Sequence, residues 1–194
     1  MSIYAVTAPA YLKKNIPVIP LKEKSKIPVP DGWSGWAEHE LPAQVKKDWL
    51  SLPSNLNIGL VLGPKSGVSV LDIDIEDESI VKMLIERLPE SIWHRKGKKG
   101  MVLAYKFNPN IKKAFRLKDK AGKTLVEFLN NKLQVVLPPS VNPDPHPVTG
   151  EPIIYTANCD LLEAMKSKKF LPAPDNFEEM VRSVLDSLGY ELQS

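Results

Sequence analysis

Residues 67–80 read GVSVLDIDIEDESI, a hydrophobic strand that carries two acids. Successive side chains of a strand alternate between its faces, so Asp72 and Asp74 lie on one side, with Cα atoms about 6.5 to 7 Å apart, while Leu71 and Ile73 face a core. Two carboxylates on one face repel each other unless a cation or solvent reaches both. A divalent cation such as Mg²⁺ or Mn²⁺, which prefers carboxylate oxygens, meets this need. A strand end that emerges into solvent is the alternative.

A third acid, Glu127, interrupts the apolar run TLVEFL. Its neighbours Val126 and Phe128 are expected to face the core, which turns Glu127 to the other side of its strand. If this strand lies near the strand of Asp72, three carboxylates converge on one metal site. An outward-facing glutamate on a half-exposed strand explains the pattern equally well.

Between these acids lies the basic turn HRKGKKG, residues 94–100. Its two glycines allow the backbone to approach a phosphate closely, and Arg95, Lys98 and Lys99 supply positive charge for nucleotide binding. The turn lacks the GxxxxGK[ST] pattern of a Walker A loop. A basic turn at a sheet edge is the plain alternative. Carboxylates for a metal beside a basic turn for phosphate are, however, the layout of phosphoryl or nucleotidyl transfer.

The net charge of +3 hides an uneven distribution. Residues 93–123 contain 11 Lys and Arg against one acid, and the rest of the chain contains 15 basic and 22 acidic residues, so a block of +10 lies in a body of about −7. This asymmetry favours a polyanionic partner, nucleic acid or nucleotide phosphates, over a solvated lysine-rich hairpin. Within the block, the residues expected to bind nucleic acid are Lys112, Lys113, Arg116 and Lys118.

Length and composition place the chain among globular proteins. Its 194 residues, 43% of them hydrophobic, suffice for one medium domain or two small lobes that share a core. No run of 18 apolar residues and no signal-peptide pattern occurs, so we expect a cytoplasmic protein without a membrane partner. Cys159 is the only cysteine, which excludes an intrachain disulfide and a cysteine-based zinc site.

The N-terminal part predicts a helix over residues 3–14, weakened by its internal proline, and an edge strand over residues 16–21. A Pro- and Gly-rich stretch at residues 22–41 is too long for an ordinary connection and predicts a functional loop or flap. We expect Trp33 and Trp36 to pack this flap onto the body, with stacking on nucleic-acid bases as the alternative.

Strands and helices are interspersed along the rest of the chain. Residues 57–63 and 67–75 predict a hairpin-like strand pair, and residues 76–88 an amphipathic helix. Further strands are predicted at residues 101–107, 124–129 and 133–137, and further helices at residues 42–50, 158–168 and 176–188. This order favours an α+β fold, or mixed α/β, over a purely parallel sheet.

Several segments together resemble the primase-polymerase (prim-pol) domains of the archaeo-eukaryotic primase superfamily. In chain order these segments are YLKKNIPVIPL, KSKIPVPDGW, NLNIGLVLGPKSGVSVLDID, RKGKKGMVLAY, VEFLNNKLQVVLPPSVNPD and TGEPIIY. The similarity covers residues 4–155, and NIGL-to-DID and QVVLPPS are its most specific parts. Such domains commonly form the N-terminal part of replication proteins of plasmids, phages and integrated mobile elements, often followed by a helicase.

The resemblance implies a fold and a set of ligands. It implies a prim-pol domain over residues 1–171, with an RRM-like catalytic sheet and a smaller N-terminal α/β part. Residues 172–194 would then form a linker and a C-terminal helix that could lead to a further domain. The expected ligands are two Mg²⁺ or Mn²⁺ ions, nucleoside triphosphates and a DNA template with its primer.

The resemblance also assigns site residues by position. Asp72 and Asp74 match the first acidic motif of the family, and Glu127 matches its third motif, where Asp is more usual. Gln134 and Ser140 match the segment that lines the nucleotide pocket. The implied chemistry is two-metal nucleotidyl transfer.

Two positions depart from the family pattern. The histidine that usually follows the GxxG turn aligns with Val102, and a second histidine, after PPS, aligns with Asn142. Valine cannot hydrogen-bond to a nucleotide, so another residue would have to supply that contact. The candidates for this contact are Lys98, Lys99, His94 and His146.

The sequence therefore predicts a DNA primase-polymerase, a nucleotidyltransferase with Asp72, Asp74 and Glu127 as catalytic metal ligands. One alternative is a catalytically degenerate prim-pol fold that binds single-stranded DNA or nucleotide within a replication protein. Another is a metal-dependent nuclease that uses the same acids.

Overall fold

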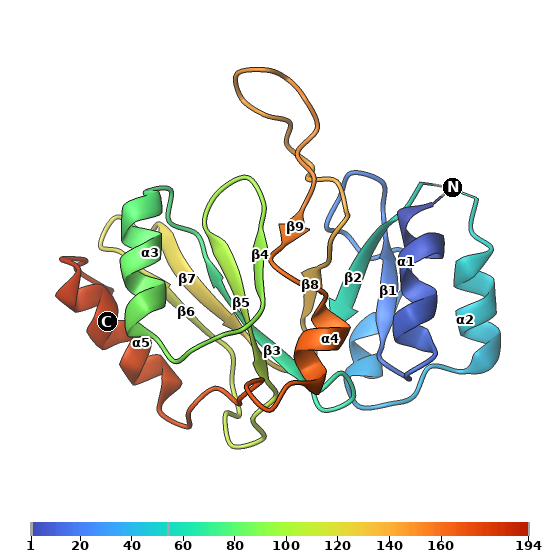
Figure 1. The fold of residues 1–194 in the computed structure, drawn as a ribbon, viewed down its shortest axis with the longest axis horizontal. Helices are drawn as coiled ribbons and strands as arrows, with labels where there is room; N and C mark the ends of the chain where they lie inside the picture. Colours follow the sequence, from blue (N-terminus) through green and yellow to red (C-terminus); the bar gives the residue numbers. More distant parts are fainter. Residues whose placement is uncertain (1, 54, 194) are drawn as a thin grey trace.

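The computed structural model describes residues 2–53 and 55–193 and contains two antiparallel sheets that lie side by side, each with its own helices (Figure 1). The α+β class expected from the sequence is confirmed. The small sheet has the order β1-β2-β8 and consists of β1 (Val18–Leu21), β2 (Asn57–Val61) and β8 (Gln134–Val136). As its prolines predict, β1 is an edge strand.

Two helices accompany the small sheet, α1 (Ile3–Leu12) and α2 (Ala43–Leu50). The helix α1 forms although it contains Pro9. Its buried face includes Tyr4, whose hydroxyl donates a hydrogen bond to the Val18 carbonyl at 3.0 Å, and Ala8. The packing of this face against the sheet outweighs the hydrogen bond that proline removes.

The large sheet has six strands in the order β6-β7-β3-β5-β4-β9. They are β3 (Val68–Ile73), β4 (His94–Lys96), β5 (Met101–Lys106), β6 (Phe115–Lys118), β7 (Thr124–Leu129) and β9 (Thr156–Ala157). The helices α3 (Glu78–Arg87) and α5 (Phe177–Ser187) pack on one face of this sheet, and α4 (Leu161–Lys166) lies between the two sheets (Figure 1). Asp77 caps the N-terminus of α3, because its side chain accepts hydrogen bonds from the backbone amides of Ser79 and Ile80. The helix therefore begins directly after the acidic stretch that follows β3.

Strands that are neighbours in sequence are divided between the two sheets. The hairpin predicted for residues 57–63 and 67–75 is wrong, because β2 pairs with β1 and β8 whereas β3 pairs with β5 and β7. An isolated bridge between Gly63 and Val68 marks the point where the chain changes sheets. The strands β7 and β8 likewise belong to different sheets, although three residues suffice to join their predicted ranges. A short connection therefore does not make two strands neighbours in a sheet, because the burial of each strand's faces decides which strand it pairs with.

The predicted flap, residues 22–41, folds back onto the small sheet. It contains a 3₁₀ helix, η1 (Trp33–Ala37), and Trp33 and Trp36 pack against the buried cluster that includes Val61. The packing role expected for the two tryptophans is confirmed.

The C-terminal helix α5 is part of the core of the large sheet. Phe177, Val181 and Leu185 are fully buried on it, and the Phe177 ring lies 5.1 Å from the ring of Tyr105, edge to face. The structure thus places the helix predicted at residues 176–188 against the sheet that carries Asp72.

Candidate active site

A row of five residues crosses the large sheet in register. Across the strands β6, β7, β3, β5 and β4 this row reads Arg116, Glu127, Asp72, Val102 and Arg95. Directly opposite residues of antiparallel strands point to the same face, with Cα atoms about 4.5 to 5.5 Å apart. The structure therefore brings Glu127 beside Asp72, which the sequence left open.

This row lies on the face of the large sheet that packs against the small sheet. Val68 and Val70, which share the alternation of Asp72, belong to the same buried cluster as Leu60 of β2. On the opposite face, Ile73 belongs to the core beneath α3 and α5. One face of β3 is thus apolar at Leu71 and Ile73, while the other changes from apolar to acidic at Asp72.

Asp72 is half-buried and makes no ion pair or side-chain hydrogen bond with the described part of the chain. Burial raises the pKa of Asp72, the positive charges of Arg95 and Lys26 oppose this change, and the carboxylates of Asp74 and Glu127 add to it. A carboxylate whose charged form is disfavoured in this way is well prepared for a cation.

Asp74 is held by the basic turn that follows β4. Lys99 Nζ lies 3.1 Å from Asp74 Oδ1, and the turn reaches this position through Gly100 at φ +62°. A Cβ atom added at Gly100 would stand 1.7 Å from the carbonyl oxygen of Ile73. Glycine is therefore required where the turn lies directly on the backbone next to Asp74.

Glu127 forms an ion pair with a residue of the edge strand β6. Arg116 Nη2 donates a hydrogen bond of 2.5 Å to Glu127 Oε1, and both side chains reach solvent. Arg116 was expected to bind nucleic acid, and the structure places it at the acidic centre, where it balances the charge of Glu127.

Arg95 is the buried cation of the row, with 7% of its surface exposed. Its Nη1 donates a hydrogen bond of 2.9 Å to the carbonyl of Val136 in the small sheet, and its guanidinium lies 4.5 Å above the ring centre of Tyr155. Its Nε is buried and has no hydrogen-bond partner among the described residues. Burial lowers the pKa of Arg95, which the charge of Asp72 opposes.

The two predicted site residues in β8 and just after it, Gln134 and Ser140, differ in exposure. Gln134 donates from Nε2 to the Lys26 carbonyl at 2.9 Å, and its Oε1 is buried and unpaired within the described residues. This amide lies over Gly59, where an added Cβ would stand 2.6 Å from Oε1. Ser140 is fully buried, and its hydroxyl bonds to the backbone of Ile58. A nucleotide contact from either residue stays a prediction.

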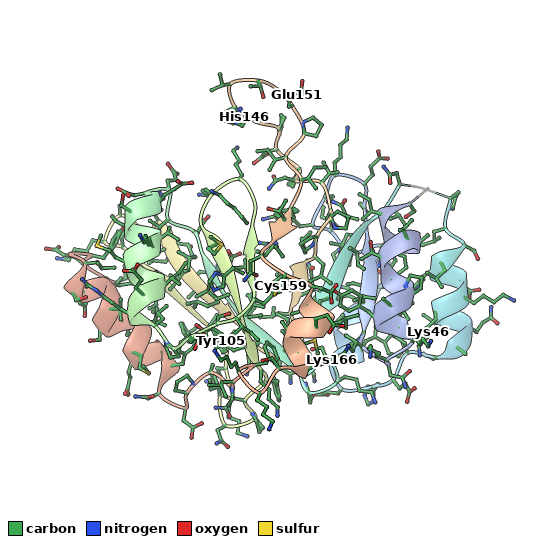
Figure 2. The ribbon with its side chains drawn as sticks, viewed as in Figure 1. Lys46, Tyr105, His146, Glu151, Cys159 and Lys166 are labelled. Carbon is green, nitrogen blue, oxygen red and sulfur yellow. The ribbon has the colours of Figure 1, made fainter. Side chains whose placement is uncertain are left out.

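A pocket of about 920 Å³ lies on the other side of β4, bordered by α3 and by the loop before β9, and Lys98, His94 and His146 are among its lining residues. Lys98 pairs with Asp144 at 3.4 Å, and His94 bonds through Nε2 to the Ser91 carbonyl at 2.7 Å. His146 lies on the projecting loop at the top of the view (Figure 2). Four residues were candidates to replace the nucleotide contact of the missing histidine. Three of them, Lys98, His94 and His146, lie on this other side of β4, whereas Lys99 pairs with Asp74.

The remaining basic residues lie near one edge of the large sheet. Lys112 and Lys113 are exposed in the loop before β6, and Lys118 ends that strand. With Arg116 they lie on the edge strand β6 or in the loop that leads into it. Their binding to nucleic acid stays a prediction.

The three carboxylates are the kind of ligand that a divalent metal prefers, but in the structure two of them, Asp74 and Glu127, are paired with basic side chains. No group of three or more His, Cys, Asp or Glu side chains arranged to hold a metal occurs in residues 2–53 and 55–193. Asp72 makes no ion pair in this part of the chain, whereas Asp74 and Glu127 pair with Lys99 and Arg116. Exchange of these two exposed partners for a metal ion would leave three oxygen ligands on one face.

The sequence matches the Prim-Pol family, described as bifunctional DNA primase/polymerase, N-terminal, over residues 8–173. The chain belongs to the Prim-Pol family. The match contains every residue of the row and both sheets, and it identifies the chain as a primase/polymerase-type domain. The resemblance to prim-pol domains noted from the sequence is confirmed.

Two further findings concern the relatives and the helices of this Prim-Pol domain. Comparison with the curated proteins finds no match. Within the described residues, no helix is both long and apolar enough to cross a membrane. The helix α5 lies outside the matched residues although it completes the core of the large sheet.

Sequence reasoning missed two residues beside the row of the Prim-Pol domain. Tyr155 supports the Arg95 guanidinium, and Lys26 of the flap contributes positive charge near Asp72. Tyr155 closes the TGEPIIY segment and Lys26 is the third residue of the KSKIPVPDGW segment, but nothing local to either residue indicates that it reaches Asp72 or Arg95.

Proposed function

We propose that this Prim-Pol domain catalyses template-directed nucleotidyl transfer in DNA replication. The supporting observation is the register pair of Asp72 and Glu127, with Asp74 on the same face, in a sheet of the Prim-Pol family. Three carboxylates on one face create a charge that only cations relieve, and phosphate-transferring enzymes use this arrangement.

The proposed cofactor is Mg²⁺ or Mn²⁺, held by Asp72, Asp74 and Glu127. Bound there, two such ions would activate the primer 3′-hydroxyl and stabilise the leaving pyrophosphate. Before a metal binds, Lys99 and Arg116 limit the repulsion among the acids. Because both ion pairs are exposed, they are weak and exchangeable.

The proposed substrates follow from the charges around the acids. Lys99 of the basic turn, Gln134 of β8 and Ser140 after it are the proposed contacts of the nucleoside triphosphate. Lys98 would join them by exchanging its exposed ion pair with Asp144 for the phosphates. The lysines on and before β6, Lys112, Lys113 and Lys118, are the proposed contacts of the DNA backbone, whose binding is largely electrostatic. A helicase, as another domain or protein, is the proposed partner that supplies single-stranded template.

The test is extension of a labelled primer on a DNA template with Mn²⁺ and deoxynucleoside triphosphates. Growth of the primer that is lost in Asp72→Ala, with DNA binding retained, supports the proposal. Failure of extension with every divalent metal tested contradicts it. Shortening of the primer would instead indicate a nuclease built on the same acids.

A binding module without catalysis is the second candidate, and Val102 favours it. The residue directly opposite Asp72 on β5 is apolar and 1% exposed, so it offers no hydrogen bond to a nucleotide. In this case the domain would bind single-stranded DNA or nucleotide through its basic residues, and Asp72→Ala would leave every measured function intact.

A further inference from the structure

Arg95 is buried in a way that needs explanation. Removing a guanidinium from water costs several kcal/mol unless charged or hydrogen-bonding partners compensate. In the described structure Arg95 has a single hydrogen bond, to the Val136 carbonyl, and its Nε is buried without a partner. Asp72 attracts it, but the two side chains form no ion pair. The protein itself satisfies this cation only in part.

The Arg95 guanidinium packs on the face of the Tyr155 ring. This ring, 2% exposed, lies 4.5 Å from the guanidinium carbon of Arg95, close enough for a cation–π interaction. The ring is fixed at its hydroxyl, which accepts a hydrogen bond of 3.0 Å from Asn142 Nδ2. It is also fixed against Gly97, where an added Cβ would stand 2.7 Å from the ring. The orientation of Arg95 is thus set by Tyr155 and Asn142.

The side chain of Arg95 lies on the same face of the large sheet as the carboxylate of Asp72. Along β4 it faces the side of the sheet that carries Asp72, whereas its neighbour Lys96 faces α3 and pairs with Glu78 at 2.8 Å. Val102, which lies between Arg95 and Asp72 in the row, contributes no polar atom. On this side of Asp72 the first polar group of the row is therefore the Arg95 guanidinium.

We propose that Tyr155 and Asn142 form a rigid support that presents Arg95 to the phosphates of the nucleoside triphosphate beside Asp72. Arg95 contacts the substrate, and Tyr155 and Asn142 are positioning residues that act through it. The inference rests on the proposed function for the identity of the anion. A planar guanidinium binds phosphate oxygens in a bidentate, charge-assisted way. We place its contact at the β- and γ-phosphates, which a triphosphate has and a monophosphate lacks.

The experiment measures equilibrium binding of a deoxynucleoside triphosphate and of the corresponding monophosphate, without primer, in the presence of Ca²⁺. Arg95→Gln is expected to weaken triphosphate binding about 10- to 100-fold while changing monophosphate binding less than about 3-fold. Tyr155→Leu should weaken triphosphate binding selectively and by a smaller factor. Tyr155→Phe, which keeps the ring, should stay closer to the wild-type protein.

Lys96→Gln is the matched control, because it removes a charge from the same strand on the opposite face. It should leave both affinities unchanged. If Arg95→Gln lowers the melting temperature so far that it cannot be assayed, Arg95→Lys replaces it, with an expected 3- to 10-fold selective loss, since lysine lacks the planar fork. Wild-type triphosphate affinity in both Arg95→Lys and Tyr155→Leu overturns the inference, as does equal loss for the two ligands.

Primer extension separates this inference from the proposed function. In an active enzyme, Tyr155→Leu should raise the nucleotide KM more than it lowers kcat. Extension with an unchanged KM in the Arg95 and Tyr155 variants overturns the inference and leaves the proposed function standing. Selective triphosphate binding through Arg95, without extension in any metal, supports the inference and overturns the proposed function.

Discussion

Asp72 on β3 and Glu127 on β7 face each other across adjacent antiparallel strands, so two like charges occupy one register position of the large sheet. Such a pair destabilises a sheet, typically by a few tenths to about 1 kcal/mol. Asp74 adds a third negative charge on the same face, and burial raises the pKa of Asp72 in addition. The arrangement therefore lowers stability, and a cation bound at the proposed site would relieve this repulsion.

Asp72→Asn tests this relation between stability and function. The change removes the charge that burial and two carboxylates disfavour, so the free energy of unfolding should stay equal or rise by up to about 1 kcal/mol. Primer extension should fall about 100-fold or more, because the central metal ligand is lost. Urea unfolding and an extension assay measure the two effects. The control is Asp48→Asn on α2, far from the row, which should change neither the free energy of unfolding nor primer extension. A large loss of stability in Asp72→Asn would contradict the conclusion that the charge of Asp72 destabilises the sheet.

Arg116→Gln tests whether Glu127 is a metal ligand. Arg116 and Mn²⁺ would compete for the same carboxylate, so the variant should bind Mn²⁺ about 3- to 10-fold more tightly in a primer-free titration. Its free energy of unfolding should fall by no more than about 1 kcal/mol, because the ion pair is exposed. The control is Lys120→Gln, which breaks the exposed pair of Lys120 with Glu191 on the neighbouring turn. Equal Mn²⁺ affinity in all three proteins would remove Glu127 from the ligand set.

Gly100→Ala tests the close approach of the basic turn to β3. The added methyl group must displace the Ile73 carbonyl, and the residue must also keep a positive φ. We expect a loss of about 2 to 5 kcal/mol in the free energy of unfolding. Gly150→Ala is the matched control, since Gly150 also has a positive φ but no atom within 4 Å of the added Cβ. It should lose only about 1 to 2 kcal/mol. Equal losses would mean that the turn does not lie on β3.

Phe177→Ala tests whether α5 belongs to the folding unit. The Phe177 ring contacts Tyr105 and Phe128 in the core beneath the acidic strand. Its removal should lower the free energy of unfolding by about 3 to 5 kcal/mol in urea denaturation. Glu179→Ala, on the exposed side of the same helix, should change it by less than about 0.5 kcal/mol. A small effect of Phe177→Ala would show that the matched residues 8–173 fold without the helix.

The comparison of sequence and structure separates local from long-range information. The alternation around Asp72 and Asp74 and the packing of the flap tryptophans were predictable, because each depends on a few consecutive residues. The partners of the strands at residues 57–63 and 67–75 were not predictable, since each strand is buried on both faces and can accept several partners. The helix α1 formed despite Pro9 because tertiary packing outweighs a local preference.

By itself, then, the sequence determined that Asp72 and Asp74 share one face of a strand, because the backbone of any strand imposes this alternation. It also determined the basic block and the family. Only the tertiary structure decided that Glu127 joins the two aspartates and that Arg95, held by Tyr155, is the buried cation beside them. These relations depend on strand order and register across the sheet, which are set by the burial of residues far apart in the chain.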